Sequence, residues 1–306
     1  MKVALFGGTG FVGNYIVDEL LNAGHEPHIL VRPQNASKLI QSEKCITYSG
    51  HIENEVVIME MMKNSDAIIY NIGLIRQFPK KGITFEKLHF EGVKRTIKLA
   101  ESAKIKRYIL MSANGVKMDG TPYQTTKYIA EQFLKNSTLD WTIFRPSLIF
   151  GDPRGTIEFC SQLKKDMLGL PIPAPLFFNG LIPKNAGSFS FNPVHVTDVA
   201  KCFVRALEKE SAIGKTYAVG GEMTVTWKEL IKTITSSNGK NKWSIPAPVF
   251  PIKMFAKLLD RFSWFPITAD QLTMLMEGNT CSSNVFEEFD VKPLEFSGES
   301  LQYLNE

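Results

Sequence analysis

Three polar residues in the first half of the chain, Ser112, Tyr123 and Lys127, have the types and the spacing needed for proton transfer. Tyr123 and Lys127 are four residues apart, so they would share one face of a helix. An ammonium group beside a phenol stabilises the phenolate and lowers the pKa of the tyrosine from about 10, which suits a general acid or base. Ser112 follows an apolar run and could hydrogen-bond a substrate oxygen. Because such a pair usually lies on a solvated helix face, the catalytic interpretation depends on the fold around it.

A glycine-rich segment near the start of the chain could hold phosphate. Residues 7–13 have the sequence GGTGFVG, directly after an apolar run at 2–6 and before helical spacing at 15–21. Small residues let the chain turn sharply, and the N–H groups of a helix N-terminus attract a pyrophosphate. A tight turn without a ligand is the alternative, but strand, motif and helix in succession predict a dinucleotide site. The predicted contacts are Gly7, Thr9, Gly10, Phe11, Val12 and Gly13.

The end of the second apolar run favours one form of the dinucleotide. About 20 residues beyond the glycines, where an acidic residue would select NAD(H), the chain has Arg32, followed by Lys38. A guanidinium can hold a phosphate through two parallel hydrogen bonds. The sequence therefore favours NADP(H) as the cofactor. NAD(H) is the alternative, in which Arg32 is a solvated residue at a strand end.

Short strand-like and helical segments alternate through the first 150 residues and would position these groups. Apolar runs lie at 2–6, 28–31, 45–48, 67–70, 108–111 and 141–144. Helical spacing is clearest at 85–103 and 122–134, and Thr121 with Gln124 predicts a capping box at the start of the second helix. Strands alternating with helices predict an α/β fold, a Rossmann-like doubly wound parallel sheet.

After residue 151 the alternation loosens, which predicts a second, smaller lobe. We expect an NAD(P)-binding core at 1–151 and a substrate lobe at 152–306, with residues of about 190–220 returning to the core. Open α/β folds bind ligands at the carboxyl ends of their strands, so the lobe would lie over that edge. A stretch rich in proline and glycine at 169–187 predicts a functional loop.

Several local patterns predict elements of that lobe. Residues 191–196 predict a strand, and Thr197 would cap a helix at 198–208. Residues 226–229 form a capping box that opens another helix, and further helices are expected at 249–262 and 268–277. Three aromatic residues could form an apolar substrate wall or a patch for a partner. They are Phe262, Trp264 and Phe265.

Composition excludes several classes of protein. Of 306 residues, 44% are hydrophobic and 22% are charged, so the chain can bury a core and is not disordered. Its net charge of +4 is spread along the chain and does not indicate nucleic-acid binding. Four cysteines without a CxxC pair predict a reducing compartment and no metal site. Prolines interrupt the uncharged residues 167–183, so we expect a cytoplasmic protein that could still bind at a membrane surface.

Together these motifs resemble the extended and atypical short-chain dehydrogenase/reductase superfamily, which includes NAD-dependent epimerases and dehydratases. The resemblance rests on GGTGFVG, Ser112, Tyr123 with Lys127, and RPS at 145–147. Further segments resemble the branch that contains the nucleotide-binding accessory subunit of respiratory complex I and its bacterial relatives. They are NIG at 71–73, TFEKLH at 84–89, FRPSLIFG at 144–151 and PVHVTDVA at 193–200.

The resemblance implies that Ser112, Tyr123 and Lys127 form a catalytic trio where the protein is an enzyme. Beside the glycine loop, the implied cofactor contacts are Arg32, Asn71, Gly73, Lys127, Pro146, Ser147 and Leu148. Two positions depart from the family pattern. His51 stands where many relatives have an acidic residue that touches the adenine, and His89 where extended members often place an asparagine facing the active site. We expect packed or solvated side chains at both.

The sequence leaves three functions open. The first is an NADP(H)-dependent oxidoreductase acting on a carbonyl or hydroxyl group. A sugar-nucleotide epimerase or dehydratase is an alternative, because such an enzyme would use the same trio. The uncharged run at 168–182 favours an apolar or quinone-like substrate over a sugar nucleotide. The second is a non-catalytic NADPH-binding subunit or assembly factor of a respiratory or membrane complex, which would not need the intact trio. The third is a regulator that senses the NADP redox state and acts on a soluble partner. The sequence does not specify the oligomeric state.

Overall fold

The computed structural model describes residues 1–237, 239, 241–259, 267–281 and 285–305, and the chain forms two compact units. Unit 1 comprises Met1–Pro146, Val196–Val219 and Ser283–Lys292. Unit 2 comprises Ser147–His195, Gly220–Ser282 and Pro293–Glu306. The chain therefore passes from one unit to the other several times. The aromatic residues Phe262, Trp264 and Phe265 lie outside the described residues.

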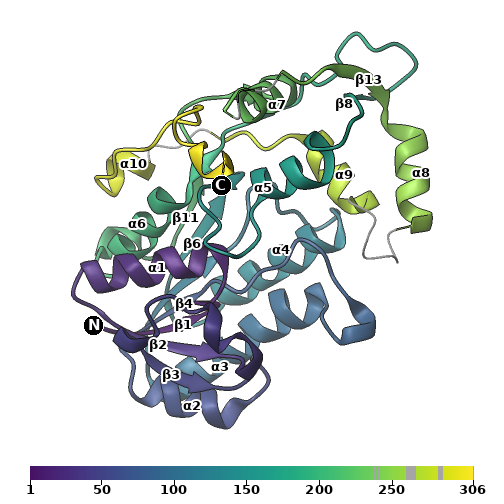
Figure 1. The fold of residues 1–306 in the computed structure, drawn as a ribbon. Helices are drawn as coiled ribbons and strands as arrows, with labels where there is room; N and C mark the ends of the chain where they lie inside the picture. Colours follow the sequence, from purple (N-terminus) through teal and green to yellow (C-terminus); the bar gives the residue numbers. More distant parts are fainter. Residues whose placement is uncertain (238, 240, 260–266, 282–284, 306) are drawn as a thin grey trace. The chain divides into compact units, whose positions relative to one another are not determined.

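Unit 1 is built on a seven-stranded parallel sheet, which confirms the predicted fold class (Figure 1). The strands are β1 (Lys2–Phe6), β2 (Glu26–Val31), β3 (Ile46–Ser49), β4 (Ala67–Tyr70), β5 (Arg107–Met111), β6 (Asp140–Pro146) and β11 (Lys215–Val219). Their order is β11-β6-β5-β4-β1-β2-β3, so the winding reverses between β1 and β4. A ligand of such a sheet binds beside this reversal, at the carboxyl ends of the strands.

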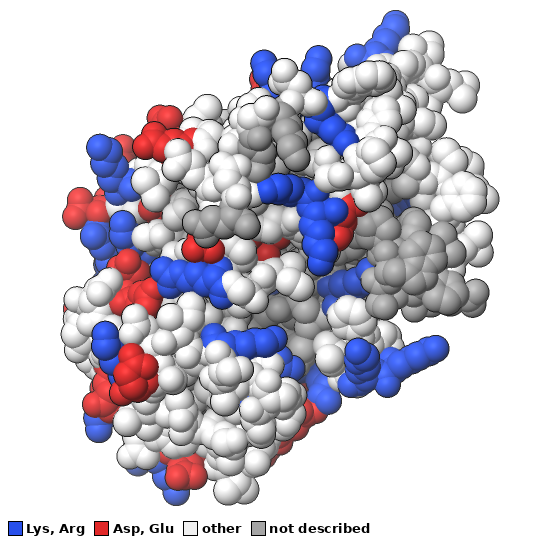
Figure 2. Space-filling view, in the orientation of Figure 1, with Lys and Arg blue, Asp and Glu red and all other residues white. Residues whose placement is uncertain are grey.

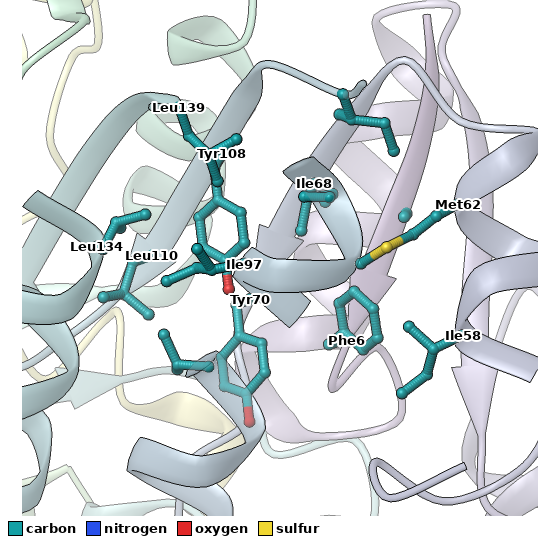
Figure 3. Close-up of a cluster of buried hydrophobic side chains, with 14 of the residues drawn as sticks. Phe6, Ile58, Met62, Ile68, Tyr70, Ile97, Tyr108, Leu110, Leu134 and Leu139 are labelled. Carbon is teal, nitrogen blue, oxygen red and sulfur yellow. The ribbon is translucent and has the colours of Figure 1, made fainter. Parts of the chain in front are cut away.

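Helices cover this sheet in two groups. They are α1 (Phe11–Asn22), α2 (Glu55–Lys63), α3 (Gly92–Ala103), α4 (Pro122–Lys135) and α6 (Val196–Ala206), with the short α10 (Val285–Glu288). Helix α1 packs on α6, while α3 packs between α2 and α4. The core under α2, α3 and α4 includes Phe6, Tyr70 and Tyr108, all fully buried (Figure 3).

Two helices of unit 1 differ from the predicted ones at their starts. The predicted helix at 85–103 begins as a π-helical segment, Glu86–Glu91, which continues into α3. Helix α6 begins at Val196, so Thr197 lies inside the helix and the prediction that it is the cap was wrong. The capping box of Thr121 and Gln124 is confirmed, and Pro122 is the first residue of α4.

Unit 2 contains two-stranded sheets and helices around a hydrophobic core that includes Trp227. Its strands are β7 (Ile149–Phe150), β8 (Ala174–Phe178), β9 (Ser190–Phe191), β10 (Val194–His195), β12 (Val225–Thr226) and β13 (Ser244–Pro248). Its helices are α5 (Phe159–Leu163), α7 (Trp227–Ser236), α8 (Val249–Leu259) and α9 (Ala269–Glu277). The predicted capping box at 226–229 is confirmed. Among the described residues, no helix is both long and apolar enough to cross a bilayer.

Two predicted segments of unit 2 were only partly right. The proline- and glycine-rich stretch at 169–187 contains β8, which pairs in parallel with β13. The single strand expected at 191–196 is instead two short strands, β9 and β10, that pair with different partners. Pro193 lies between them, and a proline cannot donate to a strand ladder, which explains the break.

Candidate functional site

The glycine loop lies between the ends of β1 and β4, at the reversal of the sheet. Gly7 has a φ of +94°, and a Cβ there would lie 2.9 Å from the carbonyl carbon of Asn71. A Cβ on Gly13 would lie 2.0 Å from the carbonyl oxygen of Gly7. Side chains at either position would therefore push apart the turn, the first helix and β4. Glycine is required here by the close approach of three backbone segments.

The N-terminus of α1 is open to an anion. Gly10 is the N-cap residue and has no side chain that could accept from the first turn. The N–H groups of Phe11, Val12 and Gly13 therefore have no acceptor within the helix, and they carry the positive end of its dipole. Thr9 precedes them, half-buried. Small residues and free backbone donors in this arrangement fit a pyrophosphate.

The segment after β4 connects the glycine loop with Lys127. The Asn71 side-chain amide donates to the carbonyl oxygen of Gly7 at 3.5 Å. Two residues further, a Cβ on Gly73 would lie 3.7 Å from the Nζ of Lys127. The structure thus brings Gly7, Asn71, Gly73 and Lys127 together along the carboxyl edge of one sheet.

Arg32 and Lys38 lie on the turn that follows β2. Arg32 is exposed, and the Asn35 amide, turned with its oxygen toward it, accepts from Nε at 3.3 Å and from Nη2 at 2.6 Å. The buried side chain of Asn14 on α1 donates to the carbonyl oxygen of Lys38 at 3.2 Å and accepts from the N–H of Ile40 at 3.2 Å. Asn14 therefore fixes this turn against the helix that begins the glycine loop. Asn14 was not predicted from the sequence, although its place four residues after Gly10 was a signal.

Lys127 is buried beside Ser112 at the end of β5. Its ammonium donates to the carbonyl oxygen of Met111 at 3.0 Å and lies over the ring of Tyr123, 5.7 Å from the ring centre. Ser112 is buried, and its Oγ has no hydrogen-bond partner among the described residues. Ser112, Met111, Lys127 and His89 line one narrow pocket. Ser112 and Lys127 therefore share a pocket, and the ring of Tyr123 lies beside Lys127.

Burial sets the protonation of this group. Desolvation lowers the pKa of Lys127 to about 8, while the nearby carboxylate of Glu131 acts in the opposite direction. Desolvation raises the pKa of Tyr123 above its usual 10. This direction is opposite to the one expected from the ammonium alone, because the phenol is removed from water as well. At neutral pH the chain thus holds a protonated phenol next to an ammonium.

His89 is a satisfied, buried side chain. Its Nε2 accepts from the N–H of Leu74 at 3.1 Å, so its Nδ1 carries the proton and faces the Oγ1 of Thr126 at 3.3 Å. Burial and the charge of Lys127 hold the pKa of His89 well below its usual range. Its ring packs edge to face on Tyr123, with 5.2 Å between the ring centres. His89 thus positions the tyrosine as a neutral, packed histidine, and His51 is exposed.

A buried ion pair lies one helical turn after Lys127. Glu131 on α4 has a fully buried side chain, and Arg145 on β6 donates to it through Nε at 2.8 Å and Nη2 at 2.5 Å. Arg145 was predicted only as part of a motif, and Glu131 was not predicted from the sequence. Its spacing of four from Lys127 was the available signal. The pair places a negative charge near Lys127 without exposing it to solvent.

The last predicted contacts lie where the chain leaves unit 1. Pro146 ends β6, and its carbonyl oxygen accepts from the N–H of Asn114 at 2.9 Å. Ser147 and Leu148 belong to unit 2, where the Ser147 hydroxyl donates to the carbonyl oxygen of Asn279 at 2.7 Å and Leu148 is buried. All other predicted site residues lie in unit 1.

Comparisons with known proteins identify a family that includes this chain. The model of a family described as NAD(P)H-binding matches residues 7–172. The 40 kDa subunit of the mitochondrial NADH-ubiquinone oxidoreductase of Neurospora crassa is 23% identical, with 98% of this chain and 78% of that protein covered. The photosystem II assembly factor Ycf39 of Synechocystis is 25% identical, covering 96% of this chain and 87% of that protein.

Solved structures share the fold. The UDP-glucose 4-epimerase of Thermus thermophilus, in a complex with NAD, superposes with a TM-score of 0.73 at 16% identity. The superposition covers 100% of this chain and 98% of the epimerase. The chain therefore shares the fold of this epimerase. The relatives above confirm the predicted resemblance to the branch that contains the complex I accessory subunit.

Proposed function

This chain belongs to the NAD(P)H-binding family, and on that premise we propose that it is an NADP(H)-dependent oxidoreductase for a carbonyl or hydroxyl group. The proposal is supported by buried polar groups whose hydrogen-bonding capacity the described residues do not fully use. Within the described part of the chain, the Ser112 hydroxyl has no partner, and the Lys127 ammonium, which has three N–H bonds, makes one hydrogen bond. Buried donors of this kind are costly unless a ligand completes them.

The trio has the protonation states that reduction of a carbonyl needs. The bound nicotinamide supplies or accepts the hydride. Tyr123, kept protonated by its raised pKa, donates its proton to the substrate oxygen. Lys127 stabilises the phenolate that remains, and Ser112 donates a hydrogen bond to the same oxygen. In the opposite direction the same groups remove the proton of a hydroxyl.

The cofactor is NADP(H), held by the glycine loop, by Asn71, and by Arg32 and Lys38 at the 2′-phosphate. The exposed guanidinium of Arg32, oriented by Asn35, supports the phosphate form. An apolar or quinone-like substrate is supported by the uncharged run at 168–182, which exposes Leu170 and Ile172.

Replacing Tyr123 with Phe tests the proposal. Tyr123→Phe keeps the ring and removes the proton, so we expect turnover to fall by about 10²–10⁴-fold with nearly unchanged affinity for NADPH. Hydride transfer is followed by NADPH absorbance against a panel of quinones and carbonyl compounds. Tyr128→Phe, on the same helix, is the control and should keep full activity. A Tyr123→Phe protein that turns over like the wild type would remove the catalytic role.

Replacing Arg32 with Asp tests the choice of cofactor. A charged, bidentate contact contributes about 1.5–3 kcal/mol, so Arg32→Asp should weaken NADPH about ten- to hundredfold and NADH much less. Titration of both nucleotides measures this difference. Lys44→Asp makes the same change at an exposed lysine outside the site and should alter neither affinity. Equal losses for NADPH and NADH in Arg32→Asp would contradict the role of Arg32.

A second candidate is a non-catalytic NADPH-binding subunit or assembly factor that acts at the periphery of a membrane complex. The names of the relatives support it, since one is a subunit of a respiratory enzyme and another a photosystem assembly factor. This candidate predicts tight NADPH binding, no turnover with any member of the panel, and a membrane complex that purifies with the native protein. Epimerase activity on a sugar nucleotide, with NADP(H) unchanged at the end, would instead identify the chain as a sugar-nucleotide epimerase.

A further inference from the structure

Helix α8 in unit 2 carries a large apolar face that the described residues leave exposed. Phe250, Met254, Phe255 and Leu258 follow one another at helical spacing along one side. Phe250 is 77% exposed and Leu258 is 65% exposed, values unusual for such side chains. The opposite side of the helix contains the buried Val249 and Ala256.

The β8–β13 ribbon extends this apolar surface. Trp243, 81% exposed, stands just before β13, and Ile245 on the strand is exposed as well. Because the two strands are parallel and Phe178 pairs with Pro248, the residues after β8 begin beside the start of α8. Leu181, 99% exposed, and Ile182 lie there. We call these side chains of α8, β13 and residues 181–182 the α8 surface.

The elements that form the α8 surface carry lysines and no acidic residue, whereas Asp270 and Glu277 lie on α9, which packs against α8. Residues 167–187 and 237–259 contain no glutamate, and no aspartate. Lys253 and Lys257, four residues apart, follow one edge of the apolar face of α8, and Lys184 is exposed beside Ile182. In Figure 2, the visible side of α8 is white, without acidic residues. Lysines at the edge of an apolar face can extend their ammonium groups away from it while their stems stay in apolar contact.

From this arrangement we infer that the α8 surface binds the interface of a bilayer that contains anionic lipids. Helix α8 would lie in the plane of the interface, with Phe250, Phe255 and Leu258 among the acyl chains and its lysines at the phosphates. A second copy of the chain fits less well, because a symmetric contact through this surface would bring lysines together without any acidic partner. The inference does not depend on whether the trio in unit 1 is catalytic.

Sedimentation with vesicles tests the inference on the full chain. We expect the protein to sediment with vesicles of phosphatidylcholine that contain about one third phosphatidylglycerol, and much less with pure phosphatidylcholine. Raising the salt to about 0.5 M should weaken but not abolish binding, since the apolar part is not screened. Emission of Trp243 should shift to shorter wavelength on binding, and Trp243→Phe should remove that part of the shift.

Two double variants separate the apolar contribution to vesicle binding from the contribution of the lysines. Phe250→Ser with Phe255→Ser should reduce vesicle binding about tenfold or more, because two aromatic side chains no longer enter the lipid. Lys253→Glu with Lys257→Glu should reduce binding to anionic vesicles by a similar factor. The controls change exposed residues of unit 1, with Val56→Ser for the first pair and Lys63→Glu with Lys98→Glu for the second. Unchanged melting temperature and NADPH affinity show that each variant is folded.

Two results would overturn the inference. One is a wild-type protein that stays in solution with every vesicle, whether or not it captures a soluble protein. The other is a concentration-dependent dimer in sedimentation velocity that Phe250→Ser with Phe255→Ser abolishes while vesicle binding is unchanged, which would assign the surface to a second copy.

Discussion

Two buried cations near the two ends of β5 differ in how well the protein satisfies them. Arg107, the first residue of the strand, donates to the carbonyl oxygens of Asp140, Ala206 and Leu207 and to the hydroxyl of Thr142, at 2.5–3.2 Å. Lys127, near the other end, donates to one carbonyl oxygen. Both are desolvated, and burial lowers the pKa of both groups, to about 10 for Arg107 and about 8 for Lys127.

This difference distinguishes Arg107, a cation with a structural role, from Lys127, a cation that is available to a ligand. At the amino end of the sheet, each nitrogen of the guanidinium has an acceptor, and the acceptors lie on β6 and at the end of α6, two segments of unit 1 that Arg107 connects with β5. At the carboxyl end, the ammonium and the Ser112 hydroxyl keep hydrogen-bonding capacity that the described protein does not use. A binding site that keeps polar groups without hydrogen-bond partners in the protein is locally less stable than a fully hydrogen-bonded region.

Replacing Arg107 with Met should have the largest effect on stability. It removes the donor of four hydrogen bonds, three of them to backbone carbonyl oxygens, so we expect the free energy of unfolding to fall by about 3–5 kcal/mol. Urea unfolding followed by circular dichroism measures it. Lys106→Met, at the exposed neighbour, should change stability by less than about 0.5 kcal/mol. If Arg107→Met were as stable as the wild type, the contrast between the two ends would be lost.

Replacing Lys127 with Met should act in the opposite direction on stability. Burying the ammonium opposes folding, so the nucleotide-free variant should be more stable at pH 7 by about 1–3 kcal/mol, while NADPH affinity and turnover fall. The folded pKa of about 8 lies below the usual 10.5. Between these values the unfolded chain binds more protons, so the stability of the wild type rises with pH and the gain in the variant shrinks. A variant that is less stable at pH 7 would show that the ammonium contributes to the fold.

Replacing Ser112 with Ala should have the smallest effect. Because its hydroxyl has no partner among the described residues, we expect a change in unfolding free energy within about 0.5 kcal/mol, together with slower turnover. Thr96→Val is the matched comparison, since the Thr96 hydroxyl is 2.8 Å from the hydroxyl of Tyr108 and should contribute about 1–2 kcal/mol. Thermal melts of both variants at the same pH distinguish the two. A large loss in Ser112→Ala would mean that its hydroxyl is structural.

The sequence predicted the parts of the fold that depend on near neighbours. Strand and helix alternation, the glycine loop and the capping box of Thr121 with Gln124 are local patterns, and the structure has all three. The spacing of Tyr123 and Lys127 placed them correctly on one helix. These features follow from hydrogen bonds and helical geometry within a few residues.

What the sequence could not predict depends on contacts between distant residues. The acceptors of Arg107 lie up to 100 residues away. The pKa of Tyr123 follows the burial that Phe85 and His89 create from another helix, so its direction could not be read from the spacing of Lys127. Helix α6 begins at Val196, two residues before the predicted start, and packs on α1, which is far from it in the sequence.

The order in which the ribosome releases the chain has a consequence for the sheet of unit 1. Strand β6 pairs on one side with β5 and on the other with β11, and about 70 residues (147–214) separate β6 from β11. At about 5–20 residues per second, β6 is an unpaired sheet edge for several seconds during synthesis. An unpaired strand edge can form hydrogen bonds with other chains and so cause aggregation. We therefore expect the nascent protein to need a chaperone most during this interval.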